Sequence, residues 1–294
     1  MRNRIAYSQN FLKDSKLIAS LIERSNISKN DLVFEIGAGS GIITEELAKQ
    51  ARKVVAFELD VSLFRKLTHS FAGNPNLELK CGNFLKFSLP YTPYKVFSNI
   101  PFNITSDIIK KLTFSVNPPK DSYLIVQKEA ALKFTGKPFT DKNSLISTIL
   151  YPWFEFSIVY KFQRSDFFPR PNVDSVLLEI KKRDEPLVNN NDRDDYRDFV
   201  VFAFSQFSPN ILEGLEKVLG SQEILTLSHK LNFLAKQKPS EINFENWLDL
   251  FNLFLVKPTN KKIIVSGSYN SWIRQQENIE KIYRTRNDKN WRRF

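Results

Sequence analysis

The chain has 294 residues, 42% of them hydrophobic and 26 of them phenylalanine, so it can bury one large core and a smaller one, which excludes intrinsic disorder. The net charge of +11 and the pI of about 9.5 favour a polyanionic partner over a cationic substrate, although charge alone does not exclude an anionic membrane surface. A single cysteine, Cys81, rules out an intramolecular disulfide and a cysteine-based zinc site. The two histidines, His69 and His229, are far apart in the sequence, so we expect no metal.

The sequence carries no signal for export or membrane insertion. No apolar run is long enough to cross a bilayer, and the basic segment 1–13 lacks the apolar stretch of a secretory signal. A lone cysteine also fits a reducing compartment. We therefore expect a monomeric cytoplasmic protein with no membrane partner.

The first predicted helix begins after Asp14, whose side chain can cap it. The segment Tyr7–Phe11 precedes this helix. Taken alone, its Gln9 and Asn10 are more typical of loop residues than of a binding site.

A glycine-rich turn follows the first predicted strand, Leu32–Ile36, and leads into a predicted helix over Ile42–Gln50. Three of the nine glycines in the chain, Gly37, Gly39 and Gly41, fall within five positions. Such clustering indicates a tight turn that lets another group approach the backbone closely. A strand, a glycine turn and a helix N-terminus are typical of the nucleotide site of doubly wound α/β proteins.

The spacing of these glycines indicates which nucleotide is bound. A dinucleotide site favours Gly-x-Gly-x-x-Gly, whereas this turn has an acid, Glu35, two positions before the first glycine. Glu35 would repel a pyrophosphate but could face the cationic end of S-adenosylmethionine. The next strand, Lys53–Glu58, ends in an acid placed to accept hydrogen bonds from the ribose hydroxyls. The alternative is a glycine turn with no ligand.

Two further strands end at the same predicted edge of the sheet. After a helix over 61–71, the strand Leu77–Cys81 is followed by Asn83, which could bond the edge of an adenine, and by Phe84, which could cover its face. The strand over 94–97 leads into Ser98 and then into the loop Asn99, Ile100, Pro101 and Phe102.

The loop 99–102 suits methylation of an exocyclic adenine amine. This nitrogen is a poor nucleophile because its lone pair is delocalised into the ring. The Asn99 side-chain oxygen and the Ile100 carbonyl can accept its two N–H bonds, Pro101 stiffens the loop, and Phe102 can stack on the base. Such a base must be flipped out or already single-stranded. The alternative is an ordinary turn at the end of a strand.

The remaining sequence predicts a second, helical part. Segment 181–195 is charged and Asn-rich and is interpreted as a linker, and 196–255 has helical periodicity with aromatic stripes typical of a small core. From Lys257 to the end, ten cations and three acids leave a net charge of +7. We expect an α/β Rossmann-like sheet over 1–183, a helical RNA-binding domain over 184–256 and a basic extension over 257–294.

Five motifs in this order resemble those of the ribosomal RNA adenine N6-methyltransferases, and the resemblance covers about residues 5 to 182. They are Ser8-Gln-Asn-Phe11, Glu35-Ile-Gly-Ala-Gly-Ser-Gly41, Asn99-Ile-Pro-Phe102, Gln127-Lys-Glu129 and Phe167-x-Pro-x-Pro-x-Val-Asp174. The resemblance implies a class I methyltransferase fold with S-adenosylmethionine as the cofactor. The expected cofactor-binding residues are Gln9, Asn10, Glu35, Gly37, Gly39, Gly41, Glu58, Leu59, Asn83, Phe84 and Asn99.

The same resemblance implies that Asn99, Ile100, Pro101 and Phe102 hold the target base and that Phe167 stacks on its other face. One departure concerns Asn83, where the family usually has Asp. An Asn oxygen can still accept from the cofactor's amine, so we expect weaker binding rather than none.

Within this superfamily the sequence is most similar to the Erm-type antibiotic-resistance methylases of large-subunit RNA. Ser8, Ile100 and Phe102 differ from the small-subunit dimethylases, and segment 204–209 carries no basic cluster. We therefore expect 23S rRNA as the substrate and resistance to macrolide, lincosamide and streptogramin B antibiotics. The alternatives are a small-subunit rRNA adenine dimethylase acting in ribosome assembly, and a catalytically idle RNA-binding protein or transcription factor on the same fold.

Overall fold

The computed structural model describes residues 10–136, 143–205 and 210–278, in two compact units. The first unit holds residues up to 131 and 156–182, and the second holds 132–155 and 183–278 of the described chain. The expected division at 183/184 and 256/257 differs from this arrangement in two ways. Segment 132–155 groups with the helical unit, and so does the described part of the basic extension.

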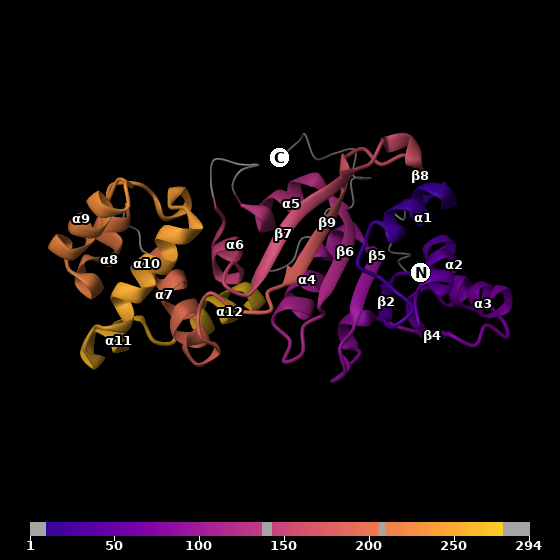
Figure 1. Ribbon diagram of the computed structural model, residues 1–294, viewed down its shortest axis with the longest axis horizontal. Helices are drawn as coiled ribbons and strands as arrows, with labels where there is room; N and C mark the ends of the chain where they lie inside the picture. Colours follow the sequence, from indigo (N-terminus) through magenta and orange to yellow (C-terminus); the bar gives the residue numbers. More distant parts are fainter. Residues whose placement is uncertain (1–9, 137–142, 206–209, 279–294) are drawn as a thin grey trace. The chain divides into compact units, whose positions relative to one another are not determined.

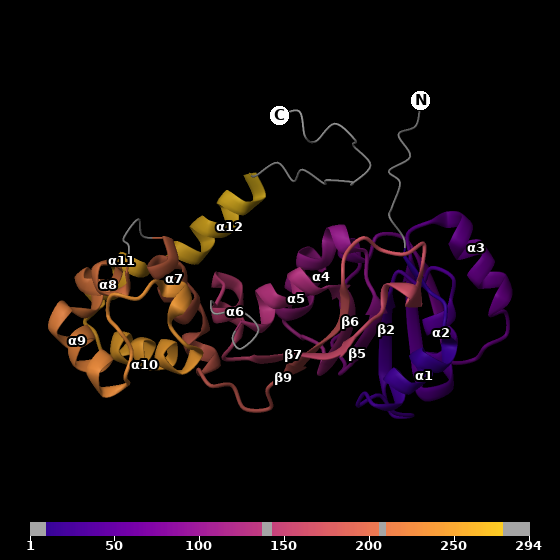
Figure 2. The ribbon, with the colours of Figure 1, turned by 90° about the horizontal axis from the view of Figure 1, so that it is seen from above.

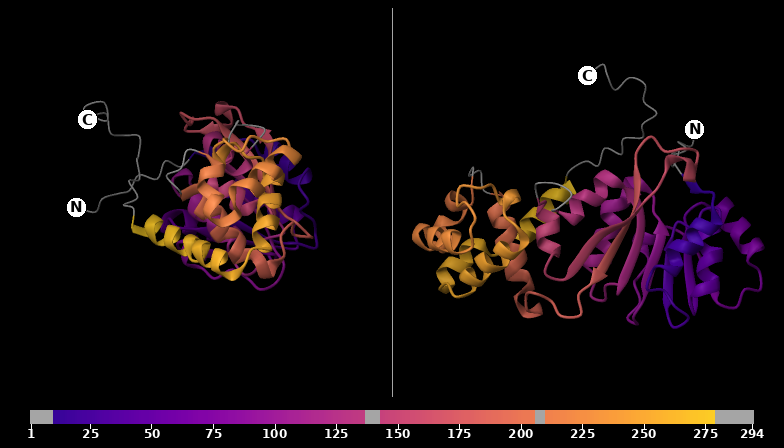
Figure 3. Two further views of the ribbon diagram at one scale, coloured as in Figure 1. Left: turned by 90° about the vertical axis from the view of Figure 1, so that its left-hand side faces the viewer. Right: turned by 45° about the horizontal axis from the view of Figure 1, so that its top comes forward.

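The first unit is built on a seven-stranded sheet with the order β4-β3-β2-β5-β6-β9-β7 (Figure 1). The first five of these strands are parallel, and β9 pairs antiparallel with β6. The long strands β6, β9 and β7 run side by side in the right panel of Figure 3. Their bounds are β2 Leu32–Ile36, β3 Lys53–Glu58, β4 Leu77–Cys81, β5 Lys95–Asn99, β6 Asp121–Gln127, β7 Phe154–Lys161 and β9 Ser175–Lys182.

Helices cover both faces of this sheet. Apolar residues of α1 (Ser15–Glu23), α2 (Ile42–Gln50) and α3 (Val61–Ser70) share one core cluster with the strands. Figure 2 shows α4 (Thr105–Thr113) and α5 (Lys128–Thr135) on the opposite side from α1 and α2. The expected Rossmann-like α/β fold is therefore confirmed.

A two-stranded ribbon lies outside the main sheet. Its strands are β1 (Phe11–Leu12) and β8 (Phe167–Phe168), paired antiparallel with Phe11 opposite Phe168 and Leu12 opposite Phe167. The sequence predicts an extended segment at 167–174 but no partner for it, because two-residue strands carry no periodic pattern. The pairing brings the N-terminal segment to the loop before β9.

The second unit is helical and has an aromatic core. Trp247, Phe199, Phe251 and Tyr196 are fully buried, and the Tyr196 hydroxyl donates to the Thr148 carbonyl at 3.0 Å. The main helices of this unit are α6 Leu145–Leu150, α7 Arg193–Ser205, α8 Ile211–Leu219, α9 Ser221–Lys230, α10 Phe244–Leu255, α11 Thr259–Val265 and α12 Ser268–Asn278.

The first part of the basic extension is packed onto this unit. Asp198 on α7 accepts from the backbone N–H groups of Gly267 and Tyr269, both at 2.7 Å, and the Arg197 guanidinium lies 5.3 Å from the Tyr269 ring centroid. Val265 is buried. Tyr269 is therefore engaged in an internal contact, and the extension beyond Asn278 lies outside the described residues. Within the described ranges, no helix is both long and apolar enough to cross a bilayer.

Candidate active site

The predicted site residues lie at the ends of three parallel strands, at one edge of the sheet. Strand β2 leads into Gly37, β3 ends at Glu58, and β5 ends at Asn99. Because these neighbouring strands are parallel, their carboxyl ends meet at the same edge. The three loops therefore lie together, as the sequence predicts. Of the predicted site residues, only Gln9 lies outside the described part of the chain.

A buried serine ties the two loops together. Strands β2 and β5 pair at Val33 with Lys95 and at Phe34 with Val96, before either loop begins. Beyond it, the fully buried Ser98 hydroxyl accepts from the Ile36 N–H at 2.7 Å. Ser98 precedes Asn99 and Ile36 precedes Gly37, so this one bond fixes the spacing of the two loops. The sequence does not indicate this role of Ser98, because its partner Ile36 lies 62 residues earlier in the chain.

The backbone amides of the glycine turn are already hydrogen-bonded within the protein. Those of Gly37 and Ala38 donate to the Phe57 carbonyl at 2.8 and 3.0 Å, and that of Gly41 donates to the Ala38 carbonyl at 2.9 Å. A phosphate cradle instead points its free N–H groups at the ligand. The turn therefore does not suit a pyrophosphate, which agrees with the reasoning from spacing.

Each glycine of the turn has a positive φ, of 80° at Gly37, 58° at Gly39 and 88° at Gly41. At Gly39 an added Cβ would meet the Phe11 ring at 2.8 Å, and at Gly41 it would meet Leu67 at 2.8 Å. At Gly39 and Gly41, glycine is therefore required both because a Cβ would clash with a neighbouring side chain and because the backbone has a positive φ. At Gly37 the nearest atom is Pro101 Cδ at 3.7 Å, so conformation alone requires glycine there.

Glu35 is enclosed rather than open to a cleft. It is 1% exposed, and its Oε2 accepts from the Thr44 hydroxyl on α2 at 2.5 Å. Burial raises the pKa of Glu35 to about 8; the Thr44 bond opposes this shift, and the charge of Glu58 adds to it. A nearby cation, such as the ammonium group of a methionine moiety, would favour the ionised form.

Glu58 is held by two backbone amides. Its Oε2 accepts from Gly39 N–H and its Oε1 from Asp60 N–H, both at 2.8 Å. Each carboxylate oxygen has a second lone pair, which suits two ribose hydroxyls. Leu59, next in the chain, is 45% exposed beside it.

The loop after β4 shows how Asn83 is oriented. Asn83 caps the short helix η1 (Phe84–Lys86), and its Oδ1 accepts from Leu85 N–H at 2.9 Å. Since only the oxygen of an amide accepts, the nitrogen is the end turned away from η1. Phe84 is 4% exposed and packs edge-on against Phe57, so its ring belongs to the core rather than to an open face.

The side chain of Asn99 is oriented by the N-terminal segment. Its Nδ2 donates to the Asn10 carbonyl at 2.8 Å. A carbonyl can only accept, so the nitrogen must face Asn10 and Oδ1 must point elsewhere. This arrangement leaves an acceptor available for an amine N–H. It also gives Asn10 a main-chain role that does not depend on its own side chain.

The rest of the 99–102 loop is compact. Ile100 is 2% exposed, and Pro101 and Phe102 are partly buried. The short helix η2 (Phe102–Ile104) and then α4 follow, and the Thr105 hydroxyl donates to the Phe102 carbonyl at 3.1 Å. These contacts restrain the position of the loop.

Phe167, which we expect to stack on the target base, has a buried ring in this structure. Its ring is 1% exposed and packs against Phe162, with 5.5 Å between ring centroids. Its neighbour Phe168 is 69% exposed. The sequence shows two adjacent phenylalanines but not which of them faces outward.

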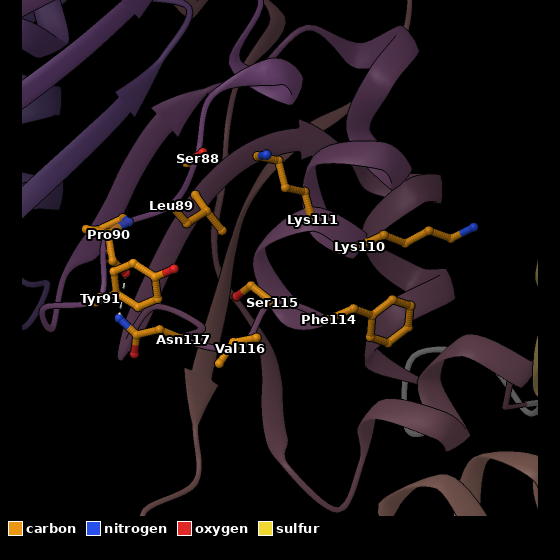
Figure 4. A pocket seen from close by; sticks show the side chains of 10 residues that line it. All are labelled: Ser88, Leu89, Pro90, Tyr91, Lys110, Lys111, Phe114, Ser115, Val116 and Asn117. Carbon is orange, nitrogen blue, oxygen red and sulfur yellow. Dashed lines mark hydrogen bonds between the residues drawn. The ribbon is translucent and has the colours of Figure 1, made fainter.

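A hollow of about 400 Å³ lies at the other edge of the sheet (Figure 4). It is lined by the loop before β5, by the end of α4 and by the segment after α4, in which Asn117 Nδ2 donates to the Pro90 carbonyl at 2.8 Å. These segments lie at the amino ends of β5 and β6, so the hollow is separate from the glycine turn. No His, Cys, Asp and Glu cluster able to hold a metal occurs among the described residues.

Comparisons with known proteins agree with this geometry. The model of the family described as ribosomal RNA adenine dimethylase matches residues 1–255. The rRNA adenine N-6-methyltransferase of Saccharopolyspora erythraea is 31% identical over 252 residues, which are 85% of this chain and 65% of that protein. The ribosomal RNA small subunit methyltransferase A of Listeria monocytogenes is 32% identical over 208 residues, 67% of this chain and 70% of that protein. The crystal structure of the 23S rRNA methyltransferase ErmE has a TM-score of 0.77 and 29% identity, covering 83% of this chain and 99% of that one.

Proposed function

The chain belongs to the ribosomal RNA adenine dimethylase family and is an S-adenosylmethionine-dependent rRNA adenine N6-methyltransferase; from this premise we propose that its substrate is a single adenine in a loop of 23S rRNA. It would act as a monomer in the cytoplasm. A methyl group on that adenine at the macrolide-binding region removes a donor and adds bulk. Macrolide, lincosamide and streptogramin B antibiotics would then bind less well while translation continues.

The orientation of Asn99 is the observation that best supports this chemistry. With Nδ2 held by Asn10, Oδ1 can accept one N–H of an adenine amine, and the Ile100 carbonyl can accept the other. Two acceptors draw the amine out of conjugation with the ring and aim its lone pair. None of these loop residues supplies a nucleophile, so their contribution is positioning and electrostatics.

The cofactor site fits the same residues. When bound, S-adenosylmethionine supplies the sulfonium methyl group. Glu58 would hold the ribose hydroxyls, the turn at Gly37 would lie along the methionine moiety, and Asn83 would lie at the adenine edge. The occupied amides of the turn are compatible with this ligand because it has no phosphate.

The choice of 23S over 16S rRNA is supported by the structural similarity to ErmE, a 23S rRNA methyltransferase, at a TM-score of 0.77. The S. erythraea enzyme aligns with 85% of this chain, and ErmE is matched over 99% of its length. The alternative is a small-subunit dimethylase, which the 32% identity to the L. monocytogenes protein favours. The loop residues Ile100 and Phe102 point away from that alternative.

The test is to express the protein in bacteria that lack their own small-subunit adenine dimethylase and then to map methylated adenines in both rRNAs. Primer extension and mass spectrometry should find one modified adenine in 23S rRNA, together with macrolide resistance. The Asn99→Ala variant should lose roughly 100-fold or more in single-turnover rate, while its cofactor affinity changes less. Methylation confined to 16S rRNA would overturn the substrate assignment.

A further inference from the structure

The loop that follows β4 is held by two side chains from opposite ends of one peptide unit. Asn83 Oδ1 accepts from the Leu85 N–H at 2.9 Å. The Lys111 ammonium on α4 donates to the Leu85 carbonyl at 3.1 Å, although the two residues are 26 positions apart in the chain. Both backbone groups of Leu85 are therefore fixed by side chains, one from the loop itself and one from a distant helix.

The short helix η1 depends on such an outside donor. It has only three residues, and the last carbonyls of any helix have no partner within it. The Phe84 carbonyl accepts from the Phe87 N–H at 3.1 Å, and Lys111 supplies the donor for the Leu85 carbonyl. Lys111 thus completes the hydrogen bonding of η1 at the end away from Asn83.

A second contact joins Lys111 to this loop. Its ammonium lies over the Phe84 ring, 5.6 Å from the ring centroid. Phe84 is buried and packs edge-on against Phe57 of β3, so its ring is fixed to the core. Lys111 therefore contacts both the backbone and a side chain of η1. Two contacts at different points restrain the orientation of this short helix as well as its position.

Helix α4 also supports the base-holding loop. Its first residue, Thr105, donates through its hydroxyl to the Phe102 carbonyl at 3.1 Å. Lys111 lies six residues further along the same helix, which corresponds to about 9 Å of helix axis. One helix is therefore bonded both to the loop that would hold the target base and to the loop that would lie at the cofactor's adenine. Transfer between two bound molecules requires such a fixed spacing.

We propose that Lys111 is a positioning residue for the cofactor: by holding η1, it keeps Asn83 at the edge of the cofactor's adenine. This inference rests on the proposed function, which places the adenine at Asn83. In this role Lys111 acts through the loop and needs no contact with the cofactor. Without the ammonium, the Leu85 carbonyl loses its donor and η1 can shift, so S-adenosylmethionine should bind less tightly.

The first test measures the Kd of S-adenosylhomocysteine by isothermal titration calorimetry. Lys111→Met keeps an unbranched, helix-favouring side chain but loses the donor, so the Kd should rise by about 2- to 12-fold, the net effect of one hydrogen bond. Lys111→Arg keeps a cationic donor and should restore much of the affinity. Lys110→Met is the matched control, because it removes the same charge from a side chain that points in a different direction from Lys111 (Figure 4). Its cofactor Kd should equal that of the wild type.

A double-mutant cycle separates positioning from general support of the fold. If Lys111 acts through the loop of Asn83, then Lys111→Met should weaken cofactor binding much less in an Asn83→Ala background than in the wild type. The KM for RNA at saturating cofactor should not change in Lys111→Met. Independent effects of the two substitutions, or an equal effect of Lys110→Met, would overturn the assignment.

The single variants also distinguish this inference from the proposed cofactor site. If Asn83→Ala weakens cofactor binding and a folded Lys111→Met variant binds like the wild type, the role of Lys111 is refuted and the cofactor site stands. If Asn83→Ala leaves the Kd unchanged, the placement of the adenine at Asn83 is wrong, and the role of Lys111 fails with it.

Discussion

Replacing Asn83 by Asp should tighten cofactor binding. In the structure Asn83 Oδ1 accepts from Leu85 N–H at 2.9 Å, so the oxygen that is expected to accept from the cofactor's amine is engaged by the protein, and Nδ2 is the end left for the ligand. The N6 amine of the cofactor's adenine is also a donor, and two donors cannot pair. An aspartate at this position would keep one oxygen on Leu85 N–H and offer the other to the amine.

The magnitude follows from one added hydrogen bond to a charged acceptor. Such a bond contributes about 1–2 kcal/mol after desolvation, which corresponds to a 5- to 30-fold lower Kd for S-adenosylmethionine or S-adenosylhomocysteine. The cap of η1 should be kept, because Asp caps helices as well as Asn does. The melting temperature without cofactor should therefore change little.

Isothermal titration calorimetry can measure this gain and assign its cause. The control is an S-adenosylhomocysteine analogue with hydrogen in place of the exocyclic amine, for which Asn83→Asp should bring no gain. An equal or weaker affinity in the variant would refute the orientation of Asn83. An equal gain with the control analogue would show that the amine is not the group recognised.

Three further predictions follow from buried or packed groups. Ser98→Ala should lower the free energy of unfolding by about 1–3 kcal/mol, because it leaves the Ile36 N–H buried without its acceptor, whereas Ser98→Thr keeps the hydroxyl; chemical denaturation measures both. Burial raises the pKa of Glu35 from 4.5 to about 8, so the native state binds the proton of this carboxyl group more tightly than the unfolded state does. Proton binding therefore stabilises the native state fully below pH 4.5, and this stabilisation is lost as the pH rises to about 8. Relative to Glu35→Gln, the unfolding free energy of the wild type should fall across this range by at most about 5 kcal/mol; parallel curves would refute the shift. Truncation after Asn278 removes six cations and two acids and should weaken RNA binding without moving the methylated position. The slope of log K against log salt concentration should become shallower by about 0.7 for each lost phosphate contact. An unchanged slope would indicate that the tail only increases solubility.

The sequence predicts the parallel sheet well because its strands are short apolar runs with clear ends. Strand β3 ends at the acid that precedes the cap Asp60, and α2 begins after Gly41, where a positive φ ends the turn. Both elements were predicted with their observed bounds. Local composition is sufficient for such elements because the signals lie within a few residues of one another.

The orientation of side chains could not be predicted in the same way. Which of Phe167 and Phe168 is buried depends on pairing with Leu12, more than 150 residues earlier in the chain. The burial of Glu35 has a similar cause, since a central parallel strand is covered on both faces and gives an acid no open side. Such facts depend on long-range contacts that no local pattern encodes.

The N-terminal segment links the cofactor turn to the base-holding loop. The Phe11 ring lies on Gly39, the Asn10 carbonyl holds Asn99 Nδ2, and the pairing of β1 with β8 fixes both. A substitution that separates β1 from β8 would free the Asn99 amide to rotate, so that Oδ1 would no longer be held toward the amine. The methyl-transfer rate should then fall even though every residue that touches cofactor or base is intact. The orientation of the Asn99 side chain thus depends on the main-chain carbonyl of Asn10. Substituting the Asn10 side chain would not remove this carbonyl.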